Sequence, residues 1–174
     1  DFLMTASNHL FDAIFASGFD RDRIFLYLPS CETRTYGALF DASGQMANAL
    51  RAAGVTVGDR VAVQVEKTPQ KLMLYLACLR TGAIFLPLNT AYTAAEVSYF
   101  LGDAAPRIFV CDGAKHDALQ NVAQEAKVSH VATLNRDGTG TLVDAMQKQP
   151  AAFENALRGP DDLAAILYTS GTTG

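Results

Sequence analysis

Short apolar runs alternate with longer amphipathic stretches along the chain. Each run is rich in β-branched or aromatic residues and is bounded by Gly, Pro or charged residues, which is typical of β-strands. The expected strands cover residues 24–28, 60–65, 83–88, 107–111 and 129–134, and residues 161–168 lead into a last strand.

The stretches between these runs carry signals for helix starts and ends. Three threonines are placed to cap helices, namely Thr35, Thr68 and Thr93. Pro69 follows the second of them, and Glu96 completes a capping box with the third. Three glycines are placed to end these helices, namely Gly54, Gly82 and Gly102. Two more helices are expected over residues 115–127 and 141–149, whereas residues 151–159 allow either a helix or a loop.

The apolar positions inside these helices recur every three or four residues, so each helix has one inward face. In the first helix that face is Tyr36, Leu39, Phe40, Ser43, Ala47 and Leu50. In the second it is Leu72, Tyr75, Leu76 and Leu79. In the helix over residues 115–127 it is Leu119, Val122, Ala123 and Ala126. Strands that alternate with such helices predict an α/β fold: a layered, mostly parallel sheet flanked by helices on both faces.

Composition and charge narrow the functional classes. The chain has 174 residues, of which 49% are hydrophobic, so it can form a single packed α/β unit rather than a disordered chain. Fourteen Lys and Arg against 18 Asp and Glu give a formal net charge of −4, and no basic run is present. This balance disfavours nucleic-acid binding. It leaves room for a local anion site, because such a site depends on a few placed donors.

Cysteine and histidine spacing points to no metal or disulfide framework. The three cysteines, Cys31, Cys78 and Cys111, lie far apart in or beside apolar runs and are expected to be buried free thiols. The histidines His9, His116 and His130 are isolated and are expected at the surface or in structural roles. No apolar stretch is long enough to span a membrane, and the start has no signal-peptide layout. We therefore expect a cytoplasmic protein with no metal ligands of its own in this chain.

The most informative residues follow the last apolar run. They are Thr169, Ser170, Gly171, Thr172, Thr173 and Gly174. In an open α/β sheet, ligands bind beyond the carboxyl ends of the strands, where this loop falls. Glycines let the backbone N–H groups converge on an anion, and the hydroxyls add donors, so the loop suits a polyphosphate. On composition alone, a plain polar turn is an equal alternative.

The string LAAILYTSGTTG at residues 163–174 resembles the phosphate-loop signature of the acyl-adenylate-forming (AMP-binding) enzymes. TYGAL at residues 35–39 and LRTGAIFLPLN at residues 79–89 resemble two further motifs of that superfamily, in the same order. LPLNTAYTAAEVSYF at residues 86–100 and AAPRIFVCD at residues 104–112 are similar to malonyl-CoA synthetases within it. The family's loop continues to a Lys-Gly pair, so we expect residues 1–174 to be the N-terminal portion of the adenylation domain, cut within the phosphate loop.

The resemblance implies a fragment of an AMP-forming acid–thiol ligase. Such an enzyme uses ATP with Mg²⁺ to convert a carboxylate to an acyl-adenylate, then transfers the acyl group to CoA. Residues 169–174 would bind the ATP phosphates, and the catalytic residues are not identified. The implied partners are a small carboxylate (malonate preferred), ATP and CoA, while the oligomeric state is left open. The alternatives are another acyl- or aryl-CoA ligase of the superfamily or, for these residues alone, a non-catalytic α/β domain; by themselves we expect them to be inactive.

Overall fold

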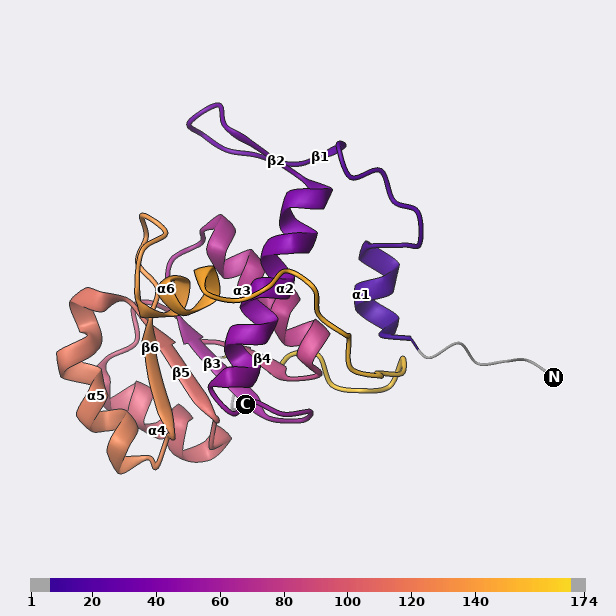
Figure 1. Cartoon of the computed structure of the whole chain (residues 1–174). Helices are drawn as coiled ribbons and strands as arrows, with labels where there is room; N and C mark the ends of the chain where they lie inside the picture. The colour runs from indigo at the N-terminus through magenta and orange to yellow at the C-terminus, as the bar shows by residue number, and fades with distance from the viewer. Residues whose placement is uncertain (1–6, 170–174) are drawn as a thin grey trace.

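The computed structural model describes residues 7–169 and builds them around one parallel sheet. Its strands are β3 (Arg60–Gln64), β4 (Ile84–Pro87), β5 (Ile108–Cys111) and β6 (His130–Thr133). They lie in the order β4-β3-β5-β6, with Val61 paired to Phe85 on one side and to Ile108 on the other. This confirms the predicted parallel α/β sheet and places all strand carboxyl ends at one edge (Figure 1).

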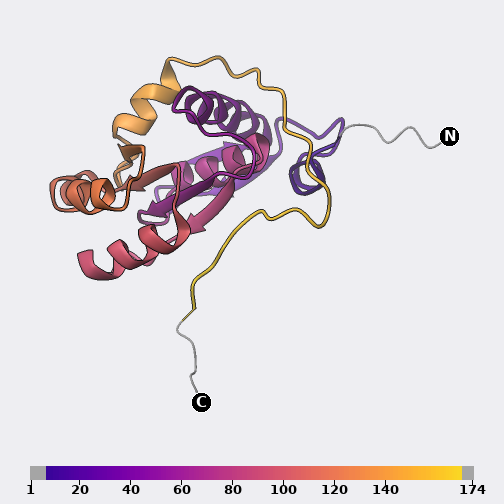
Figure 2. The same ribbon diagram turned by 90° about the horizontal axis from the view of Figure 1, so that it is seen from below.

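Helices cover both faces of the sheet, as predicted, and each face has its own core (Figure 2). One face packs on α2 (Tyr36–Ala52), α3 (Pro69–Thr81) and α6 (Thr141–Gln147). The other packs on α4 (Ala94–Ala104) and α5 (His116–Glu125), the latter preceded by the short turn η1 (Gly113–Lys115). On α5, Leu119 and Ala123 are buried and Val122 and Ala126 pack against the same core, so the predicted inward face is confirmed.

The predicted helix starts are confirmed by side-chain caps. Thr35 accepts a hydrogen bond from the Ala38 amide, and Thr68 accepts one from the Lys71 amide. Thr93 and Glu96 form the full capping box of α4. Gly82 ends α3 at a φ of 73°, a left-handed conformation that favours glycine. Local sequence therefore fixed where these helices begin.

Helix α4 runs beyond its predicted end. Gly102 stays within the helix, which continues to Ala104 and ends at Ala105 with a φ of 45°. Leu101 and Ala104 are both buried, so the apolar face continues past the glycine. Pro106 then prevents the helix from continuing.

The inward face of α3 was only partly predicted. Leu76 and Leu79 are buried, but against α1 (His9–Ile14) and α2 rather than the sheet. Leu74, Ala77 and Cys78 face the sheet instead, while Leu72 and Tyr75 are half-buried. The helix is covered on two sides because the unpredicted helix α1 lies on its outer face.

The first predicted strand does not join the sheet. Strand β1 (Ile24–Tyr27) pairs antiparallel with the unpredicted β2 (Thr33–Thr35), and the two form a hairpin at the start of α2 (Figure 1). Cys31 lies in the connecting turn with a φ of 65° and is exposed, so its predicted burial is wrong. Cys78 and Cys111 are buried free thiols as expected, and burial raises the pKa of the Cys111 thiol to about 11.

Residues 150–168, here called the strap, cross the outside of the domain without forming a helix (Figure 2). Their backbone carbonyls are bonded by side chains of other elements, which leaves them unavailable to a helix. Asn48 Nδ2 donates to the carbonyls of Pro150 and Ala152, each at 2.9 Å, and Asn8 Nδ2 donates to that of Ala156 at 3.0 Å. Long-range contacts therefore decide the ambiguous segment at residues 151–159 in favour of an extended path.

The predicted last strand over residues 161–168 is reduced to a single bridge. Ala165 pairs in parallel with Phe85 of β4, with hydrogen bonds of 3.0 Å from Phe85 N to Ala164 O and from Ile166 N to Phe85 O. The prediction of a regular strand here is therefore wrong. The pairing still sets the direction of the strap: its end emerges at the same edge as the carboxyl end of β4.

Candidate functional site

Thr169 is the only member of the predicted phosphate loop within the described residues. It is exposed at the end of the strap. Ser170, Gly171, Thr172, Thr173 and Gly174 lie outside the described residues, so their role stays a prediction. What the structure does show is the scaffold that delivers Thr169 to the carboxyl edge of the sheet.

Tyr168 fixes the last part of that scaffold to α4. Its hydroxyl donates to Asp103 Oδ2 at 2.6 Å, and its ring lies on Phe100 with the centroids 4.4 Å apart. Phe100 in turn stacks on Tyr92 at 4.8 Å. Burial and the bond to Asp103 raise the pKa of Tyr168 to about 12. The hydroxyl is protonated at neutral pH, as that of any ordinary tyrosine is, and donates to Asp103.

A hollow opens at the same carboxyl edge, which we call the carboxyl-edge hollow. Its volume is about 730 Å³, and it is lined by the ends of β3 and β4 and by the loops after them. Three cationic side chains line it, namely Lys67, Lys71 and Arg136, against one carboxylate, Glu66. The Lys71 ammonium donates to Val65 O at 2.9 Å, and burial lowers its pKa. A net positive wall of this kind suits an anionic group.

The side chain of Gln64 holds the loop that leads from β4 to α4. Its side chain is 1% exposed at the end of β3, and Nε2 donates to the carbonyls of Asn89 at 2.9 Å and Tyr92 at 3.3 Å. Its Oε1 is buried with no hydrogen-bond partner among the described residues. Sequence reasoning missed Gln64, although a polar residue at the end of an otherwise apolar run was the available signal.

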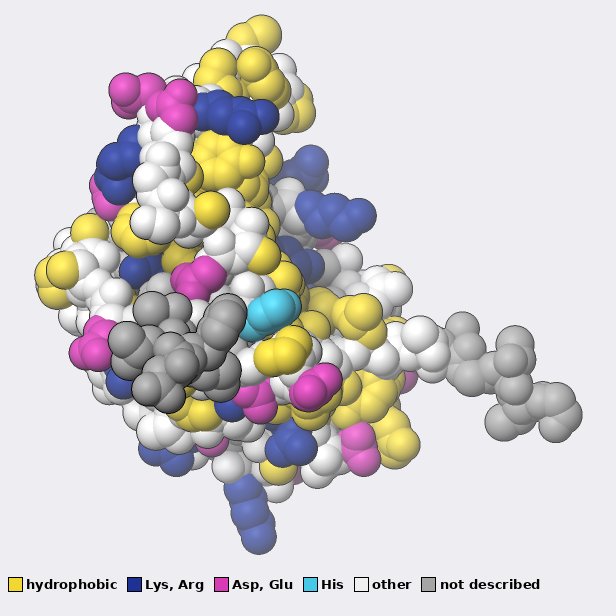
Figure 3. All heavy atoms as spheres, turned by 90° about the vertical axis from the view of Figure 1, so that its right-hand side faces the viewer, with side chains coloured by type: hydrophobic (Ala, Val, Ile, Leu, Met, Phe, Trp, Pro, Cys, Tyr) yellow, Lys and Arg dark blue, Asp and Glu magenta, His cyan; other side chains and the backbone are white. Residues whose placement is uncertain are grey.

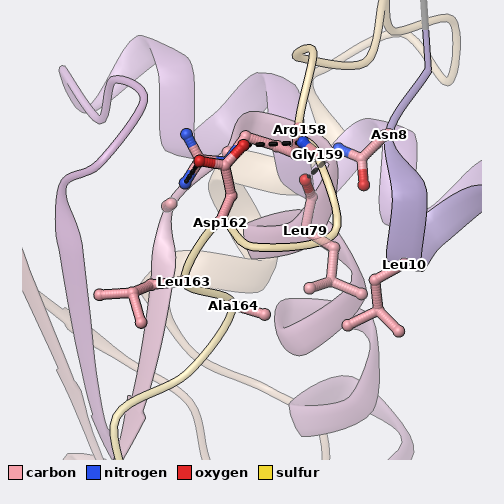
Figure 4. A pocket seen from close by; sticks show the side chains of 10 residues that line it. Asn8, Leu10, Leu79, Arg158, Gly159, Asp162, Leu163 and Ala164 are labelled. Atoms are coloured by element: carbon pink, nitrogen blue, oxygen red, sulfur yellow. Dashed lines mark hydrogen bonds and ion pairs between the residues drawn. The ribbon is translucent and has the colours of Figure 1, made fainter.

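A second pocket lies where the strap passes α1 and the end of α3 (Figure 4). Asn8 Nδ2 donates to Leu79 O at 2.6 Å, Gly159 N donates to Asp162 Oδ2 at 2.7 Å, and Arg158 pairs with Asp162 at 3.6 Å. The cavity between them is about 20 Å³, room for about one water molecule. The bonds around this cavity hold the strap in place, and the cavity itself is too small for a substrate.

The described residues offer no metal site. No group of three His, Cys, Asp or Glu side chains within residues 7–169 is arranged to hold a metal ion. His9 and His130 are exposed and His116 is half-buried, as expected of isolated histidines. Across that same range no helix is both apolar and long enough to cross a bilayer.

The strap side of the molecule carries several exposed leucines. They are Leu10, Leu157, Leu163 and Leu167, and apolar side chains reach the surface at several places on the face shown in Figure 3. Leu163 and Leu167 flank the bridge to β4, so the part of the strap nearest the predicted loop presents apolar surface outward.

Comparisons with known proteins agree with the motifs. A family model described as AMP-binding enzyme matches residues 15–174. The chain is 32% identical to an oxalate–CoA ligase of Arabidopsis thaliana over 80% of its length. It is 34% identical to a 3-hydroxybenzoate–CoA/4-hydroxybenzoate–CoA ligase of Thauera aromatica, again over 80%. The chain spans 28% of the length of each of these relatives.

Solved structures share the fold over nearly the whole chain. ATP-bound MatB from Rhodopseudomonas palustris superposes with a TM-score of 0.91 at 46% identity, covering 96% of this chain and 33% of that one. The apo form of that protein matches with the same TM-score at 44% identity. The anthranilate CoA ligase AuaEII, at 22% identity and a TM-score of 0.79 over 88% of this chain, shows the shared fold alone.

Proposed function

Because the chain belongs to the AMP-binding enzyme family, we propose that it is the N-terminal portion of the adenylation domain of an AMP-forming acid–thiol ligase. Such an enzyme joins a carboxylate to CoA through an acyl-adenylate. The observation that carries the proposal is the delivery of Thr169 to the carboxyl edge of the sheet by a strap paired in parallel with β4. That edge is where open α/β sheets bind their ligands.

We propose that residues 169–174 bind the β- and γ-phosphates of ATP through backbone N–H groups and hydroxyls. ATP and the attacking carboxylate are both anionic, so their approach needs fixed donors to offset the repulsion. The role of the loop is then orientation and charge stabilisation, with no nucleophile or general base among its residues. Mg²⁺ would enter with ATP, whose phosphate oxygens are the ligands that this ion prefers.

We propose malonate as the carboxylate. The support is the resemblance of residues 86–100 and 104–112 to malonyl-CoA synthetases, within a chain that is 44–46% identical to MatB over 96% of its length. A reducing compartment such as the cytoplasm is proposed on the two buried free thiols, Cys78 and Cys111. The alternative, another acyl- or aryl-CoA ligase, is supported by the relatives that act on hydroxybenzoates and oxalate.

The test is AMP release by the protein encoded by the complete reading frame, with ATP, Mg²⁺ and CoA. Malonate, acetate, octanoate and 4-hydroxybenzoate are compared as acids. We expect kcat/KM to be highest for malonate, by at least about tenfold, because discriminating a second carboxylate relies on a buried charged partner. A preference for another acid would refute malonate, whereas no AMP release with any acid would refute the ligase function.

We further propose that the carboxyl-edge hollow receives the phosphates of CoA. It lies on the edge to which the strap brings Thr169, and its cations Lys67 and Arg136 make no salt bridge within residues 7–169. CoA is the third anionic substrate, and it must reach the acyl-adenylate from a side that ATP does not fill.

Reversing both charges, Lys67→Glu with Arg136→Glu, is expected to raise the KM for CoA by about tenfold, since two attractive contacts become repulsive. The KM for ATP should change by less than about twofold, because the hollow is assigned to CoA. Arg34→Glu is the control, since Arg34 pairs with Glu32 on the hairpin and does not line the hollow. Equal increases in the two KM values would refute the assignment.

A further inference from the structure

We propose that Tyr168 and Asp103 form a latch that positions the start of the phosphate loop, with Tyr168 as a positioning residue. The inference rests on the proposed function, because it concerns how residues 169–174 meet ATP. Tyr168 is the residue immediately before Thr169 and donates to Asp103 Oδ2 at 2.6 Å. A hydroxyl–carboxylate bond of that length is of the short, charge-assisted kind.

The latch connects the loop to the substrate edge through an unbroken set of contacts. The Tyr168 ring lies 4.4 Å from that of Phe100, which stacks on Tyr92. The carbonyl of Tyr92 accepts from the buried Gln64 at the end of β3. These contacts connect the start of the loop to the end of β3, which also lines the carboxyl-edge hollow. The parallel bridge at Ala165 is the last described backbone pairing before Thr169, so without the latch no side-chain hydrogen bond would hold Tyr168 in place.

The position of Asp103 supports a role other than stability. It lies in the last turn of α4, where the helix dipole disfavours a negative charge. It forms no salt bridge among residues 7–169. An acidic residue at this place weakens its own helix slightly, and the described contact that it gains in return is the bond from Tyr168. Removing Asp103 should therefore change the stability of the fold little, because the lost bond and the relieved dipole penalty are of similar size.

The ring and the hydroxyl of Tyr168 can be tested separately. Tyr168→Phe keeps the ring on Phe100 and deletes only the latch bond. Asp103→Ala deletes the same bond from the other side. Tyr99→Phe is the matched control, because Tyr99 also touches Phe100 but is 68% exposed and its hydroxyl makes no hydrogen bond within the described residues.

The measurements are KM for MgATP, kcat and the melting temperature of the protein from the complete reading frame. In both latch variants we expect the KM for MgATP to rise about fivefold, which corresponds to one surface-exposed, charge-assisted hydrogen bond. The melting temperature should stay nearly unchanged in both variants, because the bond lies at the exposed end of the strap. The double variant should be no worse than either single one, because both remove the same bond.

Other results overturn the latch. An unchanged KM for MgATP in Tyr168→Phe would do so, and so would a parallel loss of melting temperature and kcat in both variants, since that pattern indicates a purely structural contact. If the unaltered protein releases no AMP, the proposed function fails separately. Hydrogen exchange of residues 164–169 in the 174-residue chain then decides the latch alone. Faster exchange in Tyr168→Phe but not in Tyr99→Phe supports it, and equal exchange refutes it.

Discussion

Replacing Arg80 with methionine is expected to lower the free energy of unfolding of the 174-residue chain by about 3 kcal/mol. Arg80 is only 2% exposed, yet it lies on α3 among apolar residues. Its guanidinium donates to Phe40 O at 2.8 Å, to Asn155 Oδ1 at 2.7 Å and to Phe153 O at 3.2 Å. Methionine matches much of the volume but removes the donor from Asn155 Oδ1 and Phe153 O, and each loss costs about 1 kcal/mol or more, whereas Phe40 O keeps the bond from the Ser43 hydroxyl at 2.8 Å.

The surroundings of Arg80 stabilise its charge without a direct salt bridge among residues 7–169, although the Asp41 carboxylate is near enough to favour the charged form. Its guanidinium carbon lies 4.5 Å from the ring centre of Phe40 and 4.9 Å from that of Phe11, so the rings add cation–π attraction. Burial lowers the pKa of Arg80 to about 10. Because the pKa of Arg80 is lower in the folded than in the unfolded chain, burying the charged guanidinium costs free energy of folding. This cost grows as the pH falls toward 10, and below pH 10 it is constant. Arg80 is protonated throughout pH 6–9, so the effect of the substitution should not vary across that range.

Urea unfolding of the 174-residue chain measures the loss, and Arg34→Met serves as the control. Arg34 makes a surface pair with Glu32 at 3.0 Å, so its replacement should cost less than about 1 kcal/mol. Because Arg80 bonds two residues of the strap, trypsin or elastase should also cut residues 150–160 faster in Arg80→Met. Equal costs for the two arginines would contradict the assigned role of Arg80.

Gly44→Ala is expected to destabilise the chain by about 2–3 kcal/mol, whereas Gly102→Ala should stabilise it by about 1 kcal/mol. Both glycines lie inside helices, where alanine is normally favoured. An added Cβ at Gly44 would overlap the carbonyl oxygen of Ala151 and lie 3.1 Å from Arg80 Nη1. At Gly102 it would meet no atom within 4 Å. The strap must therefore move away from α2 to accept alanine at position 44.

Urea unfolding also compares Gly44→Ala with Gly102→Ala. Subtracting the two changes in the free energy of unfolding cancels the intrinsic preference of a helix for alanine over glycine. We expect opposite signs. If Gly44→Ala is as stable as Gly102→Ala, the strap does not pack on α2 as described. Because the strap would move away from α2, trypsin or elastase should also cut residues 150–160 faster in Gly44→Ala, as in Arg80→Met.

Much of the fold could be read from the sequence because its signals are local. Thr35, Thr68 and the Thr93–Glu96 pair begin their helices where predicted, since a cap needs only residues within one turn. The four parallel strands were predicted from apolar runs of a length and composition that suit a buried sheet. The family motifs likewise depend on order along the chain. Together these determined the fold class and the family.

Tertiary structure decided the rest, because the deciding contacts join residues far apart in the chain. Residues 151–159 are extended because Asn8, Asn48 and Arg80 take their carbonyls, and no local pattern reveals that competition. The last apolar run is no regular strand, because β4 pairs with it at one residue only. Of the candidate site, the sequence identified the loop at residues 169–174. Only the folded chain brings Tyr168 to Asp103 and the cations Lys67 and Arg136 to one edge, since distance in space, not spacing in sequence, sets an electrostatic interaction.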